Sequence, residues 1–123
     1  MEINQITQKI IGCAIEGHRN PGPGLLESAY EECLLYEIRN AGLSAERQVA
    51  VPVVYKDIKL DYGYRIDILV ENSVVIELKT VDAIALVHEA QILTYMKFAS
   101  KNLGLLINFI VALLKDGINR FKY

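Results

Sequence analysis

Two short apolar segments of this 123-residue chain carry charged residues in their middles. YRIDILV, at 64–70, contains Asp67, and IELKT, at 76–80, contains Glu77 and Lys79. A charge within an apolar segment is costly unless another group compensates it. Carboxylates are oxygen ligands for hard divalent cations, so two of them beside an amine would suit metal-dependent chemistry.

Pairing between the two segments determines whether the acids meet. If the segments form an antiparallel hairpin centred on Asn72, Asp67 lies directly opposite Glu77. Directly opposed residues share one face of a sheet, with Cβ atoms about 4.5–5.5 Å apart. Lys79 follows Glu77 by two residues, so its side chain shares that face. This arrangement requires a three-residue loop, because a shift of one residue sends the two acids to opposite faces.

Two opposed carboxylates repel one another, and two arrangements would relieve the repulsion. Lys79 alone could pair with the acids, which would make the group an ordinary charge cluster on a surface hairpin. A divalent cation held by both acids would compensate them more strongly, and all-oxygen ligation selects Mg²⁺ first and Mn²⁺ second. Both segments also carry apolar residues that would point into a core, among them Ile76 and Leu78. This pattern indicates central strands and weakens the surface-cluster interpretation.

The rest of the chain supplies the elements that would position this hairpin. Helical spacing, strand alternation and turn residues predict the order helix, helix, three strands, helix, one or two strands. NPGPG, at 20–24, must separate the first two helices, and Pro52 predicts an edge strand or a bulge. The order predicts one α/β domain over 1–123, with a mixed central sheet flanked by helices. The expected elements are 2–18, 24–40, 47–56, 62–70, 73–80, 84–100, 103–110 and a short strand in GINRFKY. Leu26 is expected on the apolar side of the second helix, and the helix at 84–100, apolar on most sides, is expected to be buried.

Composition narrows the class of protein. Hydrophobic residues make up 52% of the chain, which suffices for a continuous core, and a net charge of −2 excludes a strongly cationic nucleic-acid coat but leaves room for a local groove. The longest apolar run, 103–114, is shorter than the about 20 residues of a membrane span. The start of the sequence lacks a signal-peptide pattern, so we expect a cytoplasmic protein. Cys13 and Cys33 lie among apolar helical neighbours and are expected to be reduced core thiols.

Several motifs together resemble a known family. Asp67 followed by Glu77-Leu78-Lys79 has the D…E-x-K form of the PD-(D/E)XK nuclease superfamily, with Ile66 where the motif's proline would stand. GLLESAY has the form G-x-x-E-x-x-Y, and HEAQILTY, LGLLINF, KDGINRF, HRNPGPG, RQV and YRID add to the match. Over nearly the whole chain the sequence resembles the small bacterial and archaeal proteins of the GxxExxY family, apart from Pro21 in the first loop.

The resemblance implies a restriction-endonuclease-like fold of α-β-β-β-α-β order, preceded here by an extra helix. It implies that Asp67, Glu77 and the backbone carbonyl of Leu78 bind the metal. It also implies that Glu27 approaches the metal through water, with stabilisation of an acid by the positive helix N-terminus as the structural alternative. Lys79 would then position the attacking water and stabilise charge on the phosphate.

Residues on the third predicted helix extend this site. His88, Gln91 and Tyr95 are spaced i, i+3 and i+7, so they form one helical stripe. Gln91 corresponds to the superfamily's helix glutamine beside the active site, and Tyr95 would contact a carboxylate or a phosphate. His88 and Arg65 are candidate substrate contacts, with a packed histidine and a salt bridge as their structural alternatives. Within the name motif, Gly24 suits a turn into the helix and Tyr30 suits a core position with a bonded hydroxyl. These two residues are not expected to act in the chemistry.

The expected function is Mg²⁺-dependent hydrolysis of phosphodiester bonds in nucleic acid, with DNA preferred to RNA as the substrate. A chain of this size has no separate recognition domain, so a homodimer or a partner protein would supply specificity. Two alternatives remain: a non-catalytic adaptor that binds nucleic acid or protein, and a carboxylate-pair hydrolase acting on sugars. The sugar hydrolase would require carboxyl groups at least about 5 Å apart and no adjacent lysine, which the hairpin parity disfavours.

Overall fold

The computed structural model describes residues 1–123. It contains three α-helices, seven strands and one 3-10 turn, with these bounds: α1 Ile3–Arg19, α2 Glu27–Asn40, β1 Ala45–Ala50, β2 Val54–Tyr55, β3 Ile58–Lys59, β4 Arg65–Val70, β5 Val74–Lys79, α3 Leu86–Phe98, β6 Leu103–Asn108, η1 Leu114–Gly117 and β7 Ile118–Lys122. Five of the strands form one mixed sheet in the order β1-β4-β5-β6-β7. Only β5 and β6 are parallel neighbours in that sheet. The predicted mixed α/β architecture is therefore confirmed.

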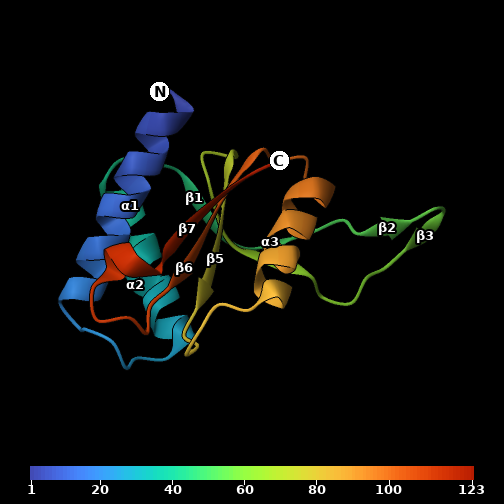
Figure 1. Ribbon diagram of the computed structural model, residues 1–123. Helices are drawn as coiled ribbons and strands as arrows, with labels where there is room; N and C mark the ends of the chain where they lie inside the picture. Colours follow the sequence, from blue (N-terminus) through green and yellow to red (C-terminus); the bar gives the residue numbers. More distant parts are fainter.

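The sheet lies between two helical layers (Figure 1). Helices α1 and α2 cover one face, where Ile10, Tyr30 and Ile76 belong to a cluster of 20 buried residues. Helix α3 covers the other face, where Ile92 and Met96 belong to a second cluster of eight. Each helix carries its apolar side chains at intervals of three or four residues, and burying that stripe against the sheet stabilises both elements. Strand β5, buried on both faces, is the central strand between the two cores.

The β4–β5 hairpin has the predicted register. Val70 pairs with Val74, so the connecting loop is the predicted three-residue loop, 71–73. Ile76 and Leu78 are fully buried against the α1–α2 layer. The parity prediction is confirmed, and it holds because the apolar face of each strand must meet a core.

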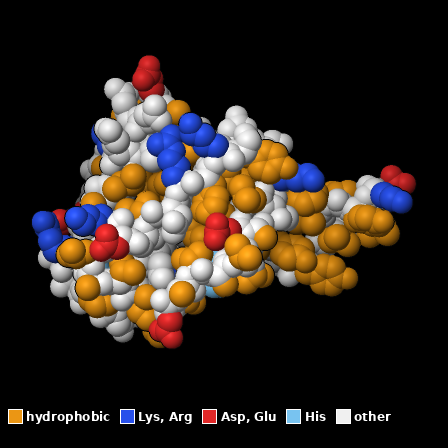
Figure 2. All heavy atoms as spheres, viewed as in Figure 1, with side chains coloured by type: hydrophobic (Ala, Val, Ile, Leu, Met, Phe, Trp, Pro, Cys, Tyr) orange, Lys and Arg blue, Asp and Glu red, His pale blue; other side chains and the backbone are white.

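The single strand predicted at 47–56 is wrong. Strand β1 ends at Ala50, and the chain beyond Pro52 forms the short antiparallel ribbon β2–β3. Pro52 has no N–H to continue a ladder, and β1 is an edge strand of the main sheet, as that proline predicts. The ribbon extends from the body as an arm that carries exposed hydrophobic side chains, among them Tyr55 and Ile58 (Figure 2).

Two predictions about burial are also wrong. The helix at 84–100 was expected to be buried on most sides, yet Leu86 and Val87 are exposed, because α3 presents only one stripe to the sheet. Leu26 was expected on the apolar side of the second helix. It is exposed, because that helix begins at Glu27 and Leu26 is its N-cap residue.

Both cysteines have free thiols. Cys13 is buried, whereas Cys33 is only half-buried, so only the first is the expected core residue. As for the membrane, none of the helices combines the length and the apolar character that a bilayer-spanning segment requires.

Candidate active site

The two acids lie where strands β4 and β5 separate. The paired ladder ends at Ile68 and Ile76, one step before Asp67 and Glu77. Beyond that point each carboxylate accepts a hydrogen bond from the opposite strand: the Asp67 N–H donates to Glu77 Oε2 at 2.8 Å, and the Leu78 N–H donates to Asp67 Oδ2 at 2.8 Å. These crossed bonds hold both carboxylates at one position, as the hairpin parity predicts.

Both carboxyl groups resist ionisation in this environment. Glu77 is 4% exposed. Burial, followed by the negative charge of Asp67, raises the pKa of Glu77 to about 8. Burial also raises the pKa of Asp67, against the opposing effect of its bond from the Leu78 N–H. A positive charge placed between the two acids would remove this cost.

The donor set fits a hard divalent cation. No lysine or arginine forms an ion pair with Asp67 or Glu77, since the ion pairs of the protein are Arg19–Glu16, Arg47–Glu31 and Arg47–Glu32. Although the more distant charge of Lys79 partly offsets both acids, the pair offers oxygen ligands free of ion pairs, the type that Mg²⁺ and Mn²⁺ select. No three His, Cys, Asp or Glu side chains are grouped closely enough to hold a metal ion. Further ligands would have to be backbone carbonyls or water.

Lys79 contacts the third helix and not the acids. Its Nζ donates to Gln91 Oε1 at 3.4 Å, and Gln91 Nε2 donates to the Tyr95 hydroxyl at 3.2 Å. The structure thus connects Lys79 with two members of the predicted helical stripe, and the salt bridge considered for this lysine is not formed. Burial and then the charge of Glu77 raise the pKa of Tyr95, so its hydroxyl stays protonated and can donate a hydrogen bond.

Glu27 is the first residue of α2, and the negative charge of the acid pair acts on its carboxyl group. Desolvation and then the charge of Asp67 raise its pKa, and the charge of Lys79 opposes this. Neighbouring motif residues explain its placement. Gly24 has a φ of +121°, which favours glycine at the turn into the helix. The buried Tyr30 hydroxyl accepts a bond from the Leu25 N–H at 3.1 Å, and it donates to a carbonyl in the preceding loop, so Tyr30 anchors that loop.

Arg65 and His88 are not brought into contact with the acids. The exposed Arg65 donates to the backbone carbonyl of Gln48 at 3.5 Å. His88 Nδ1 accepts a bond from the Ala85 N–H at 2.9 Å, which caps the start of α3. His88 therefore makes a structural contact at the helix start and not a substrate contact. Arg65 keeps one edge of its guanidinium group free.

Three residues of the site were missed in the sequence. Glu31 is 5% exposed, and its two carboxylate oxygens accept bonds from Arg47 and Gln48, each at 2.7 Å. Gln48 Nε2 also lies 3.5 Å from Asp67 Oδ1. Gln48 has a φ of +53° and no partner in the otherwise regular β1–β4 register, so a strained backbone directs it at the acids. The signals were the RQV motif, which contains Arg47 and Gln48, and the i, i+4 spacing of Glu27 and Glu31, which puts them on one helix face.

Comparison with known proteins places this site in a family. The family model described as "PD-(D/E)XK nuclease superfamily" matches residues 4–121, nearly the whole chain. Searches of curated proteins and of solved structures gave no match. The mixed sheet between helices, with its α2-β1-β4-β5-α3-β6 core, is the restriction-endonuclease-like architecture. The chain belongs to the PD-(D/E)XK nuclease superfamily.

Proposed function

We propose that this protein is a Mg²⁺-dependent nuclease of the GxxExxY type that hydrolyses phosphodiester bonds, with DNA preferred to RNA. Membership of a nuclease superfamily suggests the reaction class. The observation that carries the proposal is the acid pair: Asp67 and Glu77 converge without an ion pair to any lysine or arginine, each bonded to the backbone of the opposite strand. Mn²⁺ would substitute for Mg²⁺, because both prefer oxygen ligands.

Each residue then has a defined task. Asp67, Glu77 and the carbonyl of Leu78 would hold the cation, and Glu27 would contact it through water. When bound, the cation would polarise the scissile phosphate and activate the attacking water. Lys79, oriented by its bond to Gln91, would stabilise the negative charge that develops on the phosphate.

A row of three tyrosines supports a nucleic-acid substrate. The Tyr95 ring lies 6.2 Å from the Tyr64 ring, which lies 6.4 Å from the Tyr62 ring. Tyr62 is 78% exposed, so the row leads from the site to the surface at the base of the arm. Exposed aromatic rings beside a basic group are the usual stacking platform for unpaired bases. Arg65, exposed at the start of β4, would meet a phosphate of the same strand.

A cleavage assay tests this proposal. The purified protein is incubated with labelled single-stranded and double-stranded DNA, and with RNA of the same sequence, in the presence of Mg²⁺ or Mn²⁺. We expect metal-dependent cleavage that Asp67→Asn abolishes and that Lys79→Ala slows strongly. The matched controls, Asp57→Asn and Lys59→Ala, change the same residue types on the arm and should cleave normally. Cleavage that persists undiminished in the site variants would point to a contaminating enzyme and refute the proposal.

A second function, binding without cleavage, is favoured by the modest net charge of −2. An adaptor has no need of the metal. In that case Mn²⁺ binding measured by calorimetry should be absent, or unchanged by Glu77→Gln. The nuclease assignment predicts one Mn²⁺ site that this substitution eliminates.

A further inference from the structure

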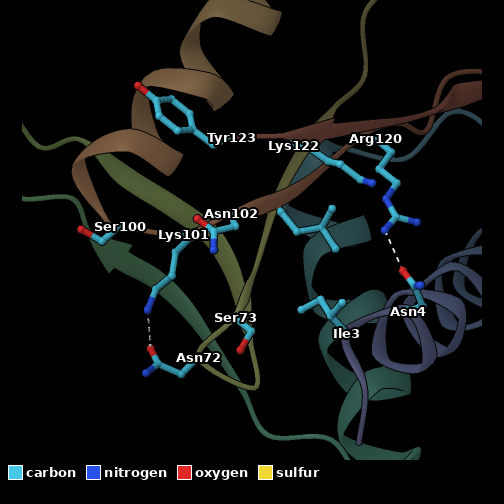
Figure 3. A pocket seen from close by; sticks show the side chains of 11 residues that line it. Ile3, Asn4, Asn72, Ser73, Ser100, Lys101, Asn102, Arg120, Lys122 and Tyr123 are labelled. Atoms are coloured by element: carbon cyan, nitrogen blue, oxygen red, sulfur yellow. Dashed lines mark hydrogen bonds between the residues drawn. The ribbon is translucent and has the colours of Figure 1, made fainter.

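A basic pocket lies at the other end of the sheet from the acid pair. It has a volume of about 650 Å³ and is formed where β5 and β6 begin, where β7 ends and beside the first turn of α1 (Figure 3). Ser73, in its wall, precedes Glu77 by four residues, a distance of about 13 Å along a strand. The pocket is therefore separate from the candidate active site.

The charge of this pocket is one-sided. Lys101, Arg120 and Lys122 line it, and no aspartate or glutamate does. None of the three forms an ion pair. The whole protein has more acidic than basic side chains, 15 against 13, so a cavity with three cations and no ion pair differs from the average surface.

Neutral groups hold two of these cations in place. Lys101 Nζ donates to Asn72 Oδ1 at 3.0 Å, and Arg120 Nη2 donates to Asn4 Oδ1 at 2.9 Å. An amide oxygen orients a cation without neutralising it. Lys122 follows Arg120 by two residues in β7, so the two side chains share one face of the strand and extend in the same direction (Figure 3). Lys and Arg side chains also gather near the N-terminal turn of α1 in the space-filling view (Figure 2). The cavity thus presents oriented positive charge to solvent.

The remaining wall adds hydrogen-bond donors and little apolar surface. Only three of the eleven lining residues are hydrophobic. The backbone N–H groups of Ile3 and Asn4 start helix α1 and have no acceptor within the helix. The acidic N-cap residue, Glu2, is exposed and does not line the pocket. Ser100 contributes a hydroxyl group, whereas the Ser73 hydroxyl already donates to the Glu71 carbonyl at 2.9 Å. Such a wall suits a polar, multiply charged anion.

We propose that this pocket binds phosphate groups, carried by a nucleotide or by a nucleic-acid strand. Three cations that line one pocket exceed what a single carboxylate needs, and Arg120 and Lys122, which lie on one side of it, match a group with a charge of about −2, as a phosphate monoester has. Arginine in particular binds phosphate oxygens through two parallel N–H groups. The volume lies within the range of about 300–1,000 Å³ that is typical of pockets for small molecules, which is larger than a simple inorganic ion needs. The site does not depend on the nuclease assignment.

Binding in metal-free buffer, where no cleavage occurs, tests the proposal. The probes are deoxyadenosine monophosphate and a fluorescent single-stranded oligonucleotide, titrated against the full chain. Arg120→Gln/Lys122→Gln is compared with Lys56→Gln/Lys59→Gln, which removes the same charge from the arm. We expect the pocket variant to bind at least about 10-fold more weakly and to lower the salt slope by about one to two, while the arm variant stays within about twofold of wild type.

The two probes also identify the source of the phosphate. Loss of nucleotide binding in the pocket variant assigns a free nucleotide, and loss of oligonucleotide binding alone assigns a strand. Equal weakening by the pocket and arm variants would show a general charge effect and overturn the proposal. So would unchanged binding of both probes by the pocket variant, or no binding of either probe by wild type. Because this test uses neither metal nor a cleavage readout, its failure is distinct from failure of the nuclease proposal. Asn72→Ala, which frees Lys101 without removing charge, should weaken binding less than the double variant does.

Discussion

Replacing Glu77 by glutamine should stabilise the metal-free protein in alkaline solution. Glu77 is buried, and burial together with the charge of Asp67 raises its pKa from 4.5 to about 8. Glutamine has nearly the same size and keeps an oxygen that can accept the 2.8 Å hydrogen bond from the Asp67 N–H. It carries no charge, so the cost of burying one disappears.

The size of the effect should depend on pH in one direction. Because the pKa in the folded state is above that of the unfolded chain, the folded protein holds the proton more tightly. Wild-type stability should therefore be fully present below about pH 4.5 and fall as the pH rises to about 8. The difference of about 3.5 pH units corresponds to a ceiling of about 5 kcal/mol, which solvent and local rearrangement reduce. The gain from Glu77→Gln should be near zero at about pH 5 and between about 1 and 5 kcal/mol at about pH 9.

Urea unfolding at three pH values, in metal-free buffer, measures this gain. Glu71→Gln is the matched control. Hydrogen bonds from Ser44 lower the pKa of the exposed Glu71, so its carboxylate favours the folded state and the substitution should not stabilise the protein at any pH. Adding Mn²⁺ should stabilise wild type and leave Glu77→Gln unaffected. A Glu77→Gln protein that is no more stable than wild type at about pH 9, or equally altered at about pH 5, would refute the reasoning.

Three further predictions concern single positions. Lys79→Ala should lower the cleavage rate by about 10²–10³ while leaving Mn²⁺ affinity nearly unchanged; equal loss of both in calorimetry and cleavage assays would contradict its role. Gln48→Gly relieves a φ of +53° and should change unfolding free energy by less than about 1 kcal/mol while slowing cleavage about 10-fold; a large loss of stability with normal cleavage would make this residue purely structural. In Gly104→Ala, the new Cβ would lie 2.7 Å from a methionine sulfur, so thermal unfolding should show a loss of about 1–3 kcal/mol. Gly12→Ala, where nothing lies within 4 Å, is its control and should not destabilise the protein; equal effects would contradict the packing argument.

The part of the site that sequence predicts best is the part that one hairpin determines. Alternation along 64–70 and 76–80, with a three-residue turn between them, leaves one register that buries the apolar residues. That register brings Asp67 and Glu77 together, as the structure confirms. Local pattern suffices here because a one-residue slip would expose the core face of both strands.

Contacts between segments that are far apart in the sequence could not be predicted from local sequence pattern. The bond from Gln48 to Glu31 joins residues 17 positions apart, and it depends on a left-handed backbone that a glutamine rarely adopts. The arm was missed for a related reason. The β-branched residues on both sides of Pro52 have the composition of one continuous strand, and only the missing proline N–H ends it.

Helix ends and exposed faces were also mispredicted, because tertiary packing decides them. Leu86 and Val87 extend the apolar pattern of the third helix, yet the sheet covers only the opposite side. The basic pocket could not be assembled from local sequence pattern, since Asn4, Asn72 and Arg120 meet only after the two ends of the chain and the hairpin loop converge.

The central claim is that Asp67 and Glu77 together hold one divalent cation. Anomalous diffraction from crystals of the protein soaked with Mn²⁺ tests it most directly. We predict a single peak at about 2.0–2.3 Å from a carboxylate oxygen of each acid, and no such peak in crystals of Glu77→Gln. A soaked wild-type crystal with no peak between these two side chains, or with Mn²⁺ bound to only one of them, would contradict the account.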